Sequence, residues 1–252
     1  MRPVKPKPQP GLPVKSKAVV TAVAITHADV SRARQDLDDL FGQVEQYYSK
    51  KMAAYGPTPL GVDWSCMPTQ EMRFVQLLKI FAFQGDANDT IALNDIGCGY
   101  GALLAFLSKR YRKKMIDYLG VDLSPAMIAQ ATKLWKKRPA TSFQLGSNGY
   151  RVADYAVASG IFNVKLGQTV SLWEQMVAQT LDEMHSTSRR GFAVNFLTPP
   201  PDGTPCVSEL YYAPPDVWCS YCQQSLGAQV EVVTGYGLRE YTLLVRHESG
   251  FR

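Results

Sequence analysis

A glycine-rich turn between two apolar segments constrains the fold of this chain most strongly. The segment NDIGCGYGALLAFL covers residues 94–107 and carries Gly97, Gly99 and Gly101 at alternate positions. Glycine allows the backbone to approach a ligand closely, and a helix that starts after such a turn aims its first N–H groups at the same place. The sequence therefore predicts a ligand-binding turn that joins a strand to a helix.

Strand-like and helix-like segments alternate around this turn, from residue 90 to residue 247. Strands separated by helices predict an α/β fold, here a Rossmann-like, doubly wound, seven-stranded sheet. We expect it to be mostly parallel, with one antiparallel strand supplied by a C-terminal hairpin. The expected strands cover residues 90–96, 115–123, 141–146, 155–162, 191–197, 228–235 and 239–247. The expected helices between them cover residues 101–114, 124–138, 168–186 and 214–226, and Ser124 is expected to cap the second of them.

Two further helices are expected before the first strand. One covers residues 30–55, and the apolar face of the other runs from Met72 to Phe81, with a loop full of helix-breaking residues between them. We expect residues 29–84 to form a helical cap on a cofactor-binding core of residues 85–252, the two making a single domain. Residues 1–28 are expected to be a flexible, basic, Pro-rich tail.

The positive net charge of +5 is confined to that tail. Five of the 27 basic residues lie within residues 1–18, which contain no acid, so the remaining 22 balance the 22 acidic residues. A neutral body with a basic tail argues against a nucleic-acid-binding core. Two basic runs within the body, residues 109–114 and 133–138, are expected to close helices, where cations complement the helix dipole.

The remaining bulk features favour a cytoplasmic protein without a membrane segment or a metal site. The sequence contains no apolar run near the ~18 residues that a membrane helix needs. Its five cysteines are irregularly spaced. Cys219 and Cys222 form a CxxC pair without a second pair, so we expect them to pack on a helix rather than hold zinc. We expect a monomer or a homodimer.

Two ligands remain open for the glycine turn on spacing alone. Gly97, Gly99 and Ala102 satisfy the dinucleotide pattern, and Asp122 follows at about the distance of a ribose-binding acid. Asp95, however, directly precedes the turn, where a carboxylate would repel a pyrophosphate but could pair with an ammonium group.

The motifs NDIGCGYG and GVDLSPAMIAQA, at this separation, resemble those of the class I S-adenosylmethionine (SAM)-dependent methyltransferases of the small-molecule type. The resemblance covers roughly residues 70–247. It implies SAM as the cofactor and methyl transfer to an O, N or C atom of a small-molecule acceptor.

The resemblance also implies a cofactor-binding set. Asp95 and the glycines would border the methionine moiety, and Asp122 would accept hydrogen bonds from the ribose hydroxyls. Many relatives carry an acid after the third strand for the adenine amino group; Ser147 or Asn148 stands there instead. The full expected set is Arg73, Asp95, Gly97, Cys98, Gly99, Gly101, Asp122, Leu123, Met127, Ser147, Asn148, Ser159 and Gly160.

The acceptor is expected above the carboxyl ends of the strands, under the cap and the loop after the fifth strand. The candidate catalytic residues are Asp63, Asn163, Glu209 and Tyr212. The candidate substrate contacts are Tyr47, Tyr48, Trp64, Phe162 and Tyr211. Phe162 and each tyrosine could equally be core residues. None of the three histidines falls naturally at the methyl group, so the acceptor is expected to arrive ionised, or a base comes from Asp63, Glu209 or the tyrosines.

Missing motifs narrow the choice of acceptor. GIFN stands after the fourth strand, where resembling methyltransferases of nucleic-acid or glutamine amino groups carry NPPY or DPPY. Methylation of a protein side chain, or a non-catalytic methyltransferase-like binding module, remain the alternatives.

Overall fold

The computed structural model describes residues 27–81, 90–149 and 151–247. The expected basic tail lies almost entirely outside these residues. The first helix, α1 (His27–Tyr55), begins at His27, so residues 27 and 28 belong to the helix rather than to the tail. None of the described helices is both long enough and apolar enough to cross a membrane.

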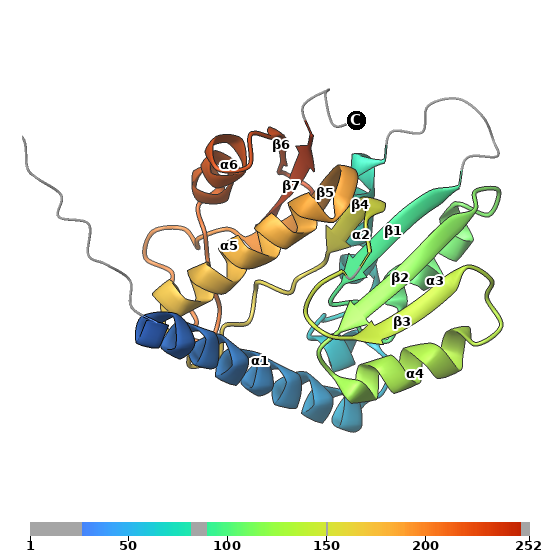
Figure 1. The fold of residues 1–252 in the computed structure, drawn as a ribbon, viewed down its shortest axis with the longest axis horizontal. Helices are drawn as coiled ribbons and strands as arrows, with labels where there is room; N and C mark the ends of the chain where they lie inside the picture. Colours follow the sequence, from blue (N-terminus) through green and yellow to red (C-terminus); the bar gives the residue numbers. More distant parts are fainter. Residues whose placement is uncertain (1–26, 82–89, 150, 248–252) are drawn as a thin grey trace, which may run out of the picture.

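The described residues form one seven-stranded sheet in the order β3-β2-β1-β4-β5-β7-β6 (Figure 1). Only β7 runs antiparallel to its neighbours, β5 and β6, and the other pairings are parallel. This confirms the predicted doubly wound fold. The strands are β1 (Ile91–Ile96), β2 (Ile116–Asp122), β3 (Thr141–Leu145), β4 (Ala153–Ala158), β5 (Ser188–Leu197), β6 (Gln229–Val233) and β7 (Glu240–Arg246).

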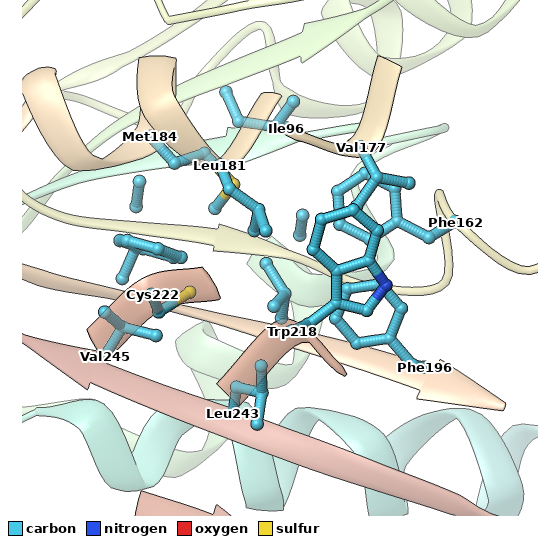
Figure 2. Packing of buried hydrophobic residues seen from close by; sticks show 14 of the residues in the cluster. Ile96, Phe162, Val177, Leu181, Met184, Phe196, Trp218, Cys222, Leu243 and Val245 are labelled. Carbon is cyan, nitrogen blue, oxygen red and sulfur yellow. The ribbon is translucent and has the colours of Figure 1, made fainter. Parts of the chain in front are cut away.

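Helices cover both faces of the sheet, and each face has its own apolar core. Cap helix α2 (Met67–Leu77) and α3 (Ala102–Arg110) pack on one face, through residues such as Phe74 and Leu104. On the other face lie α5 (Val170–Ser186) and α6 (Pro215–Gln224). Figure 2 shows the centre of that second core, where Phe162 stacks on Phe196 and Phe196 stacks on Trp218.

Strand order places the glycine turn at the point where the sheet reverses its direction of growth. The chain runs from β1 outward to β2 and β3, and then returns to pair β4 with the other side of β1. In open α/β sheets, ligands bind in the crevice that this reversal leaves at the carboxyl ends of the strands. The turns after β1 and β4 therefore meet at the expected binding position.

The N-terminal segment lies across this edge as the expected cap. In Figure 1, α1 is the long blue helix that runs from α5 to α4 (Pro125–Trp135), both of which it contacts. Two short 3-10 helices, η1 (Pro59–Val62) and η2 (Leu78–Ile80), flank α2. The Ser49 and Ser124 hydroxyls, 2.7 Å apart, join α1 to the residue that caps α4. Ser124 is the helix cap that the sequence predicts, because its hydroxyl accepts the Met127 N–H.

Two helices are shorter than their sequence patterns suggest. α3 ends at Arg110 and α4 at Trp135, so each basic run begins in the last turn of its helix, with Lys109 and Arg110 in α3 and Lys133 in α4, and continues beyond it. Cys219 and Cys222 lie on α6 as free thiols, and Cys222 is buried. Burial raises the pKa of the Cys222 thiol, which fits the packing role expected for this pair.

Candidate active site

A cavity of about 630 Å³ opens at the carboxyl ends of β1, β2 and β4, beneath the cap. This volume is in the range of pockets that bind cofactors and small molecules. Its polar end contains Asp95, Asp122 and the glycine turn. The apolar remainder comes from both cap and core, including Leu40, Val44, Phe74, Leu103, Trp173, Met176, Leu197 and Leu210.

The glycine turn is shaped by positive backbone φ angles and by close packing. Gly97 and Gly99 line the cavity with φ angles of 73° and 54°. A Cβ atom on Gly97 would lie 2.2 Å from the Ile161 side chain, so a larger residue cannot be accommodated there. Gly101 does not line the cavity. It caps α3 with φ 85°, and a Cβ there would meet the Trp135 indole nitrogen at 2.6 Å.

Asp122 is tied to the glycine turn by backbone hydrogen bonds. Its Oδ2 accepts the Gly99 N–H at 2.8 Å, and its Oδ1 accepts the Ser124 N–H at 2.9 Å. Burial raises the pKa of Asp122 to about 6, and the two backbone donors oppose that rise. Each carboxylate oxygen can still accept a second hydrogen bond, because an ionised carboxylate offers about four lone-pair sites. A vicinal diol is a suitable partner for such an acceptor pair.

Asp95 lies deeper, at the end of β1, with 2% of its surface exposed. Its Oδ2 accepts a hydrogen bond from the Tyr118 hydroxyl at 2.5 Å. Burial raises the pKa of Asp95 to about 7, and the Tyr118 hydrogen bond lowers it. Tyr118 is not among the site residues that the sequence predicts.

The turn after β4 brings two unsatisfied oxygens to the same cavity. Ser159 Oγ and Asn163 Oδ1 are buried, line the cavity and have no hydrogen-bond partner among the described residues. Between them, Gly160 (φ 77°) donates its N–H to Asn195 Oδ1 at 2.8 Å. Buried polar atoms are nearly always satisfied in folded proteins, so these two oxygens are open acceptor positions for a ligand.

On the cap side, Arg73 is a buried ion-pair partner rather than a solvated helix residue. Its guanidinium binds both carboxylate oxygens of Glu240 and donates to the Thr69 carbonyl oxygen at 2.8 Å. The Trp64 ring stacks on the guanidinium, 3.7 Å from Cζ to the ring centroid. Trp64, Arg73 and Glu240 all line the cavity.

The cap contains a second ion pair, in which Lys51 Nζ lies 2.6 Å from Asp63 Oδ1. Asp63 has a positive φ of 60°, and its Oδ2 is buried without a partner among the described residues. Burial, and then the hydrogen bond with Asp63, raise the pKa of Tyr47. Burial also raises the pKa of Tyr48, and Asp63 repels its phenolate. Asp63 and both tyrosines line the cavity.

Most of the other sequence-predicted residues are also brought to this cavity, namely Cys98, Leu123, Met127, Ser147 and Glu209. Glu209 is exposed, and hydrogen bonds from the Ser208 side chain and its own backbone lower its pKa. Asn148 lines a separate cavity of about 480 Å³, shared with α1 and α5.

Three of the expected substrate-side residues do not line the main cavity. Phe162 is packed in the core of Figure 2, where its carbonyl oxygen accepts the Trp173 indole N–H. Tyr211 is 3% exposed, and its hydroxyl bonds to Trp218 and Glu174. Tyr212 does not line the cavity itself, and its hydroxyl accepts the N–H of Val207, which does. For Phe162 and Tyr211 the core alternative holds, because both complete apolar packing beneath the loops that flank the cavity.

Sequence patterns alone did not single out Asn195 and Glu240. Both carry a weak signal, since a polar residue that interrupts or opens an apolar strand is a candidate for a buried hydrogen-bond network. Asn195 stands in GFAVNFL, and Glu240 stands in REYTLLVRH. Nothing in the sequence indicates that they contact each other or Arg73.

Comparison with known proteins agrees with this architecture. Residues 94–191 match a family described as a methyltransferase domain. The chain is 41% identical over 164 residues to Rv1506c of Mycobacterium tuberculosis, which is provisionally named a methyltransferase. That match covers 65% of this chain and 98% of Rv1506c.

Solved structures share the fold at low sequence identity. The DhpI–SAM–HEP complex has a TM-score of 0.56 at 14% identity, over 83% of this chain and 98% of DhpI. Human N-acetylserotonin methyltransferase in complex with SAM has a TM-score of 0.53 at 15% identity, over 83% of this chain and 57% of that enzyme. Magnesium protoporphyrin IX methyltransferase from Synechocystis PCC 6803, with bound S-adenosylhomocysteine (SAH), has a TM-score of 0.51 at 12% identity. That match covers 72% of this chain and 83% of the enzyme. With this fold, and with its extensive identity to the mycobacterial protein, the chain belongs to the methyltransferase family.

Proposed function

We propose that this protein transfers a methyl group from SAM to a small-molecule acceptor. The observation that carries the proposal is the placement of Asp95 and Asp122 in one cavity, at the ends of adjacent strands and on either side of the glycine turn. The solved relatives with this fold include complexes with SAM, and two of them are named for small-molecule acceptors.

The residues present fit the chemical groups of SAM. Asp122 offers its remaining lone pairs to the two ribose hydroxyls, and Leu123 and Met127 offer apolar surface to the adenine. The ammonium group requires buried acceptors, which Asp95 and the unsatisfied Asn163 Oδ1 supply. SAM, when bound, supplies a methyl group that its sulfonium makes electrophilic.

The contribution of the protein is then to align the acceptor and exclude water. In-line displacement needs little covalent help, and positioning with desolvation supplies much of the rate. Raised pKa values make Tyr47 and Tyr48 poor phenolate bases, and the lowered pKa of Glu209 makes it a weak one. Asp63, which also lines the cavity, is then the remaining candidate base, and otherwise an acceptor that is ionised, or carries a free lone pair, before it binds suits this cavity best.

The apolar share of the cavity lining supports a small molecule over a protein side chain as the acceptor. Leu40, Val44 and Met176 surround that part of the cavity from α1 and α5. A cytoplasmic location, a monomeric or dimeric state and a single domain over residues 29–252 remain predictions of this proposal, as do the individual site roles.

Calorimetric titration with SAM and with SAH tests the proposal. We expect micromolar binding by the natural protein and at least about 100-fold weaker binding by Asp122→Ala, since hydrogen bonds to a charged group are each worth about 1.5–3 kcal/mol. Asp117→Ala is the matched control. Asp117 lies on the same strand but is ion-paired with Arg151 away from the cavity. Absence of binding by the natural protein would favour the non-catalytic module.

A labelled-methyl survey then distinguishes the acceptors. Incubation with methyl-labelled SAM and a metabolite extract should place the label in the small-molecule fraction. Label that appears only in the protein fraction would instead favour side-chain methylation.

A further inference from the structure

Five residues form a closed, mostly buried circuit along one wall of the cavity. The Gly160 N–H donates to Asn195 Oδ1 at 2.8 Å, and Asn195 Nδ2 donates to Glu240 Oε2 at 2.9 Å. Glu240 in turn binds the Arg73 guanidinium, and Trp64 stacks on that guanidinium. Trp64 also closes the circuit, since a Cβ atom on Gly160 would lie 2.3 Å from its ring. We refer to Trp64, Arg73, Gly160, Asn195 and Glu240 as the Glu240 circuit.

The charged and polar side chains of the circuit are deeply buried. Arg73 is 7% exposed, Glu240 4% and Asn195 0%. Charged residues are almost never buried unless they are paired, and a buried ion pair often contributes no more stability than apolar residues of the same volume. The circuit has a clear geometric consequence, because it fixes Trp64 of the cap against the Gly160 turn of the core.

The circuit occupies one end of the cavity. Trp64, Arg73, Gly160 and Glu240 line the cavity, with the unsatisfied Ser159 Oγ and Asn163 Oδ1 beside Gly160. The adenosine end, at Asp122, Leu123 and Met127, comes from β2 and α4 and shares no residue with the circuit. The two ends of one ligand therefore depend on different parts of the fold.

We propose that Glu240 is a positioning residue for the amino-acid end of the cofactor, an inference that rests on the proposed function. Glu240 orients Arg73 on one side. The hydrogen bonds to Glu240 and Thr69 use the Nε–H and one N–H on each terminal nitrogen, of the five that a guanidinium carries. Because Arg73 also lines the cavity, the remaining two are available to a carboxylate bound there. On its other side Glu240 orients Asn195, which holds the Gly160 turn and so the acceptor Asn163 Oδ1.

A pair of ligands separates positioning from general loss of structure. SAH carries the amino-acid end, whereas methylthioadenosine has the same adenosine end without it. We expect Glu240→Gln to raise the Kd for SAH by about ten-fold or more while the Kd for methylthioadenosine changes by less than about two-fold. Equal weakening of both ligands, or unchanged binding of SAH, would overturn the inference.

An exchange of amide and carboxylate gives a rescue test. In Glu240→Gln the new amide presents N–H groups to the Asn195 amide, so one hydrogen bond is lost. Adding Asn195→Asp restores both bonds, because the amide introduced at position 240 can donate to the new carboxylate at position 195, which also accepts the Gly160 N–H. The double variant should recover most of the SAH affinity, and a Kd no better than that of the single variant would contradict the circuit.

Asn94→Ala is the matched control for Asn195→Ala. Asn94 is also a fully buried asparagine on a central strand, but it bonds to Arg151 and does not line the cavity. We expect both variants to unfold at lower denaturant concentrations, and only Asn195→Ala to change the ratio of the two Kd values. The Kd of the natural protein for SAH is measured before the variants, because it distinguishes failure of the proposed function from failure of the circuit. Failure of the natural protein to bind would refute the proposed function, whereas normal binding with an unaltered ratio in the variants would refute only the circuit.

Discussion

The Tyr118 hydroxyl donates a 2.5 Å hydrogen bond to Oδ2 of Asp95, and both residues are buried. The two residues come from neighbouring parallel strands, β2 and β1. Burial opposes ionisation of Asp95 and the hydrogen bond favours it, with the result that its pKa lies at about 7. The carboxylate that would meet the cofactor ammonium therefore titrates near neutral pH.

Cofactor affinity should consequently rise with pH. The ammonium group binds the ionised form of Asp95, so below the pKa each binding event must also release a proton. Asp122, with a pKa of about 6, also becomes ionised as the pH rises and then accepts hydrogen bonds more strongly. The Kd for SAH should therefore fall as the pH rises from about 5.5 to about 7.5. Calorimetry across this range measures the effect. Asp95→Asn should bind more weakly and with a shallower dependence, and a natural protein with a flat profile would contradict the assignment.

Tyr118→Phe should move that profile to higher pH. Removing the hydroxyl removes the hydrogen bond that stabilises the ionised Asp95, so the pKa of Asp95 rises. A hydrogen bond to a charged group is worth about 1.5–3 kcal/mol, which corresponds to about one to two pH units. Tyr241→Phe is the control, since this buried tyrosine donates to the Pro214 carbonyl instead. An unchanged midpoint in Tyr118→Phe would show that the hydroxyl does not govern Asp95.

Gly160→Ala should destabilise the protein more than Gly235→Ala. The two glycines have nearly the same φ, 77° and 74°, so both variants incur the left-handed strain of about 1–2 kcal/mol. A Cβ on Gly235 meets open space, whereas one on Gly160 would lie 2.3 Å from the Trp64 ring. We expect about 1–3 kcal/mol of additional loss for Gly160→Ala from overpacking, measured by urea unfolding. Adding Trp64→Ala should remove much of this difference, and equal losses in the two single variants would mean that Trp64 moves aside freely.

The protein should lose stability in mild acid through His185. Burial and the neighbouring His247, whose ring lies 4.1 Å away between centroids, lower the pKa of His185, while Asp182 raises it. A histidine with a lowered pKa binds fewer protons in the folded state than in the unfolded state, where its pKa is about 6.5. Stability is thus retained above about pH 6.5 and falls below it. Urea midpoints near pH 7.5 and near pH 5.5 should differ less for His185→Gln than for the natural protein. An equal difference in the two proteins would show that His185 does not cause the loss of stability in acid.

The local part of the site could be predicted because its signals lie close together in the sequence. Gly97 and Gly99 follow β1 and Asp122 ends β2, so the Gly99–Asp122 hydrogen bond lies within one strand–helix–strand unit. The mostly parallel sheet and its antiparallel C-terminal strand could be predicted from the same alternation of strands and helices. Ser124 at the start of α4 could be predicted for the same reason.

The rest depended on contacts between distant segments. Arg73 and Glu240 are 167 positions apart, and no periodicity links a residue of the cap to the first residue of β7. Phe162 and Tyr211 follow strands at the cavity edge, where sequence spacing favours exposure to a ligand. Their side chains turn into the core because Phe196 and Trp218 complete the packing there. Which side of a loop faces a ligand is decided by such packing, and a single sequence does not encode it locally.

Ser124 takes part in two contacts at once: its hydroxyl caps α4 by accepting the Met127 N–H, and it bonds to Ser49 on α1. Separating α1 from the sheet would therefore disturb the first turn of the helix beside Asp122. We expect protection from hydrogen exchange to be lost together in α1 and in the first turn of α4, as one cooperative opening event. Such an opening event would remove the wall of the cavity that α1 supplies and loosen the first turn of the helix that carries Met127 at the same time.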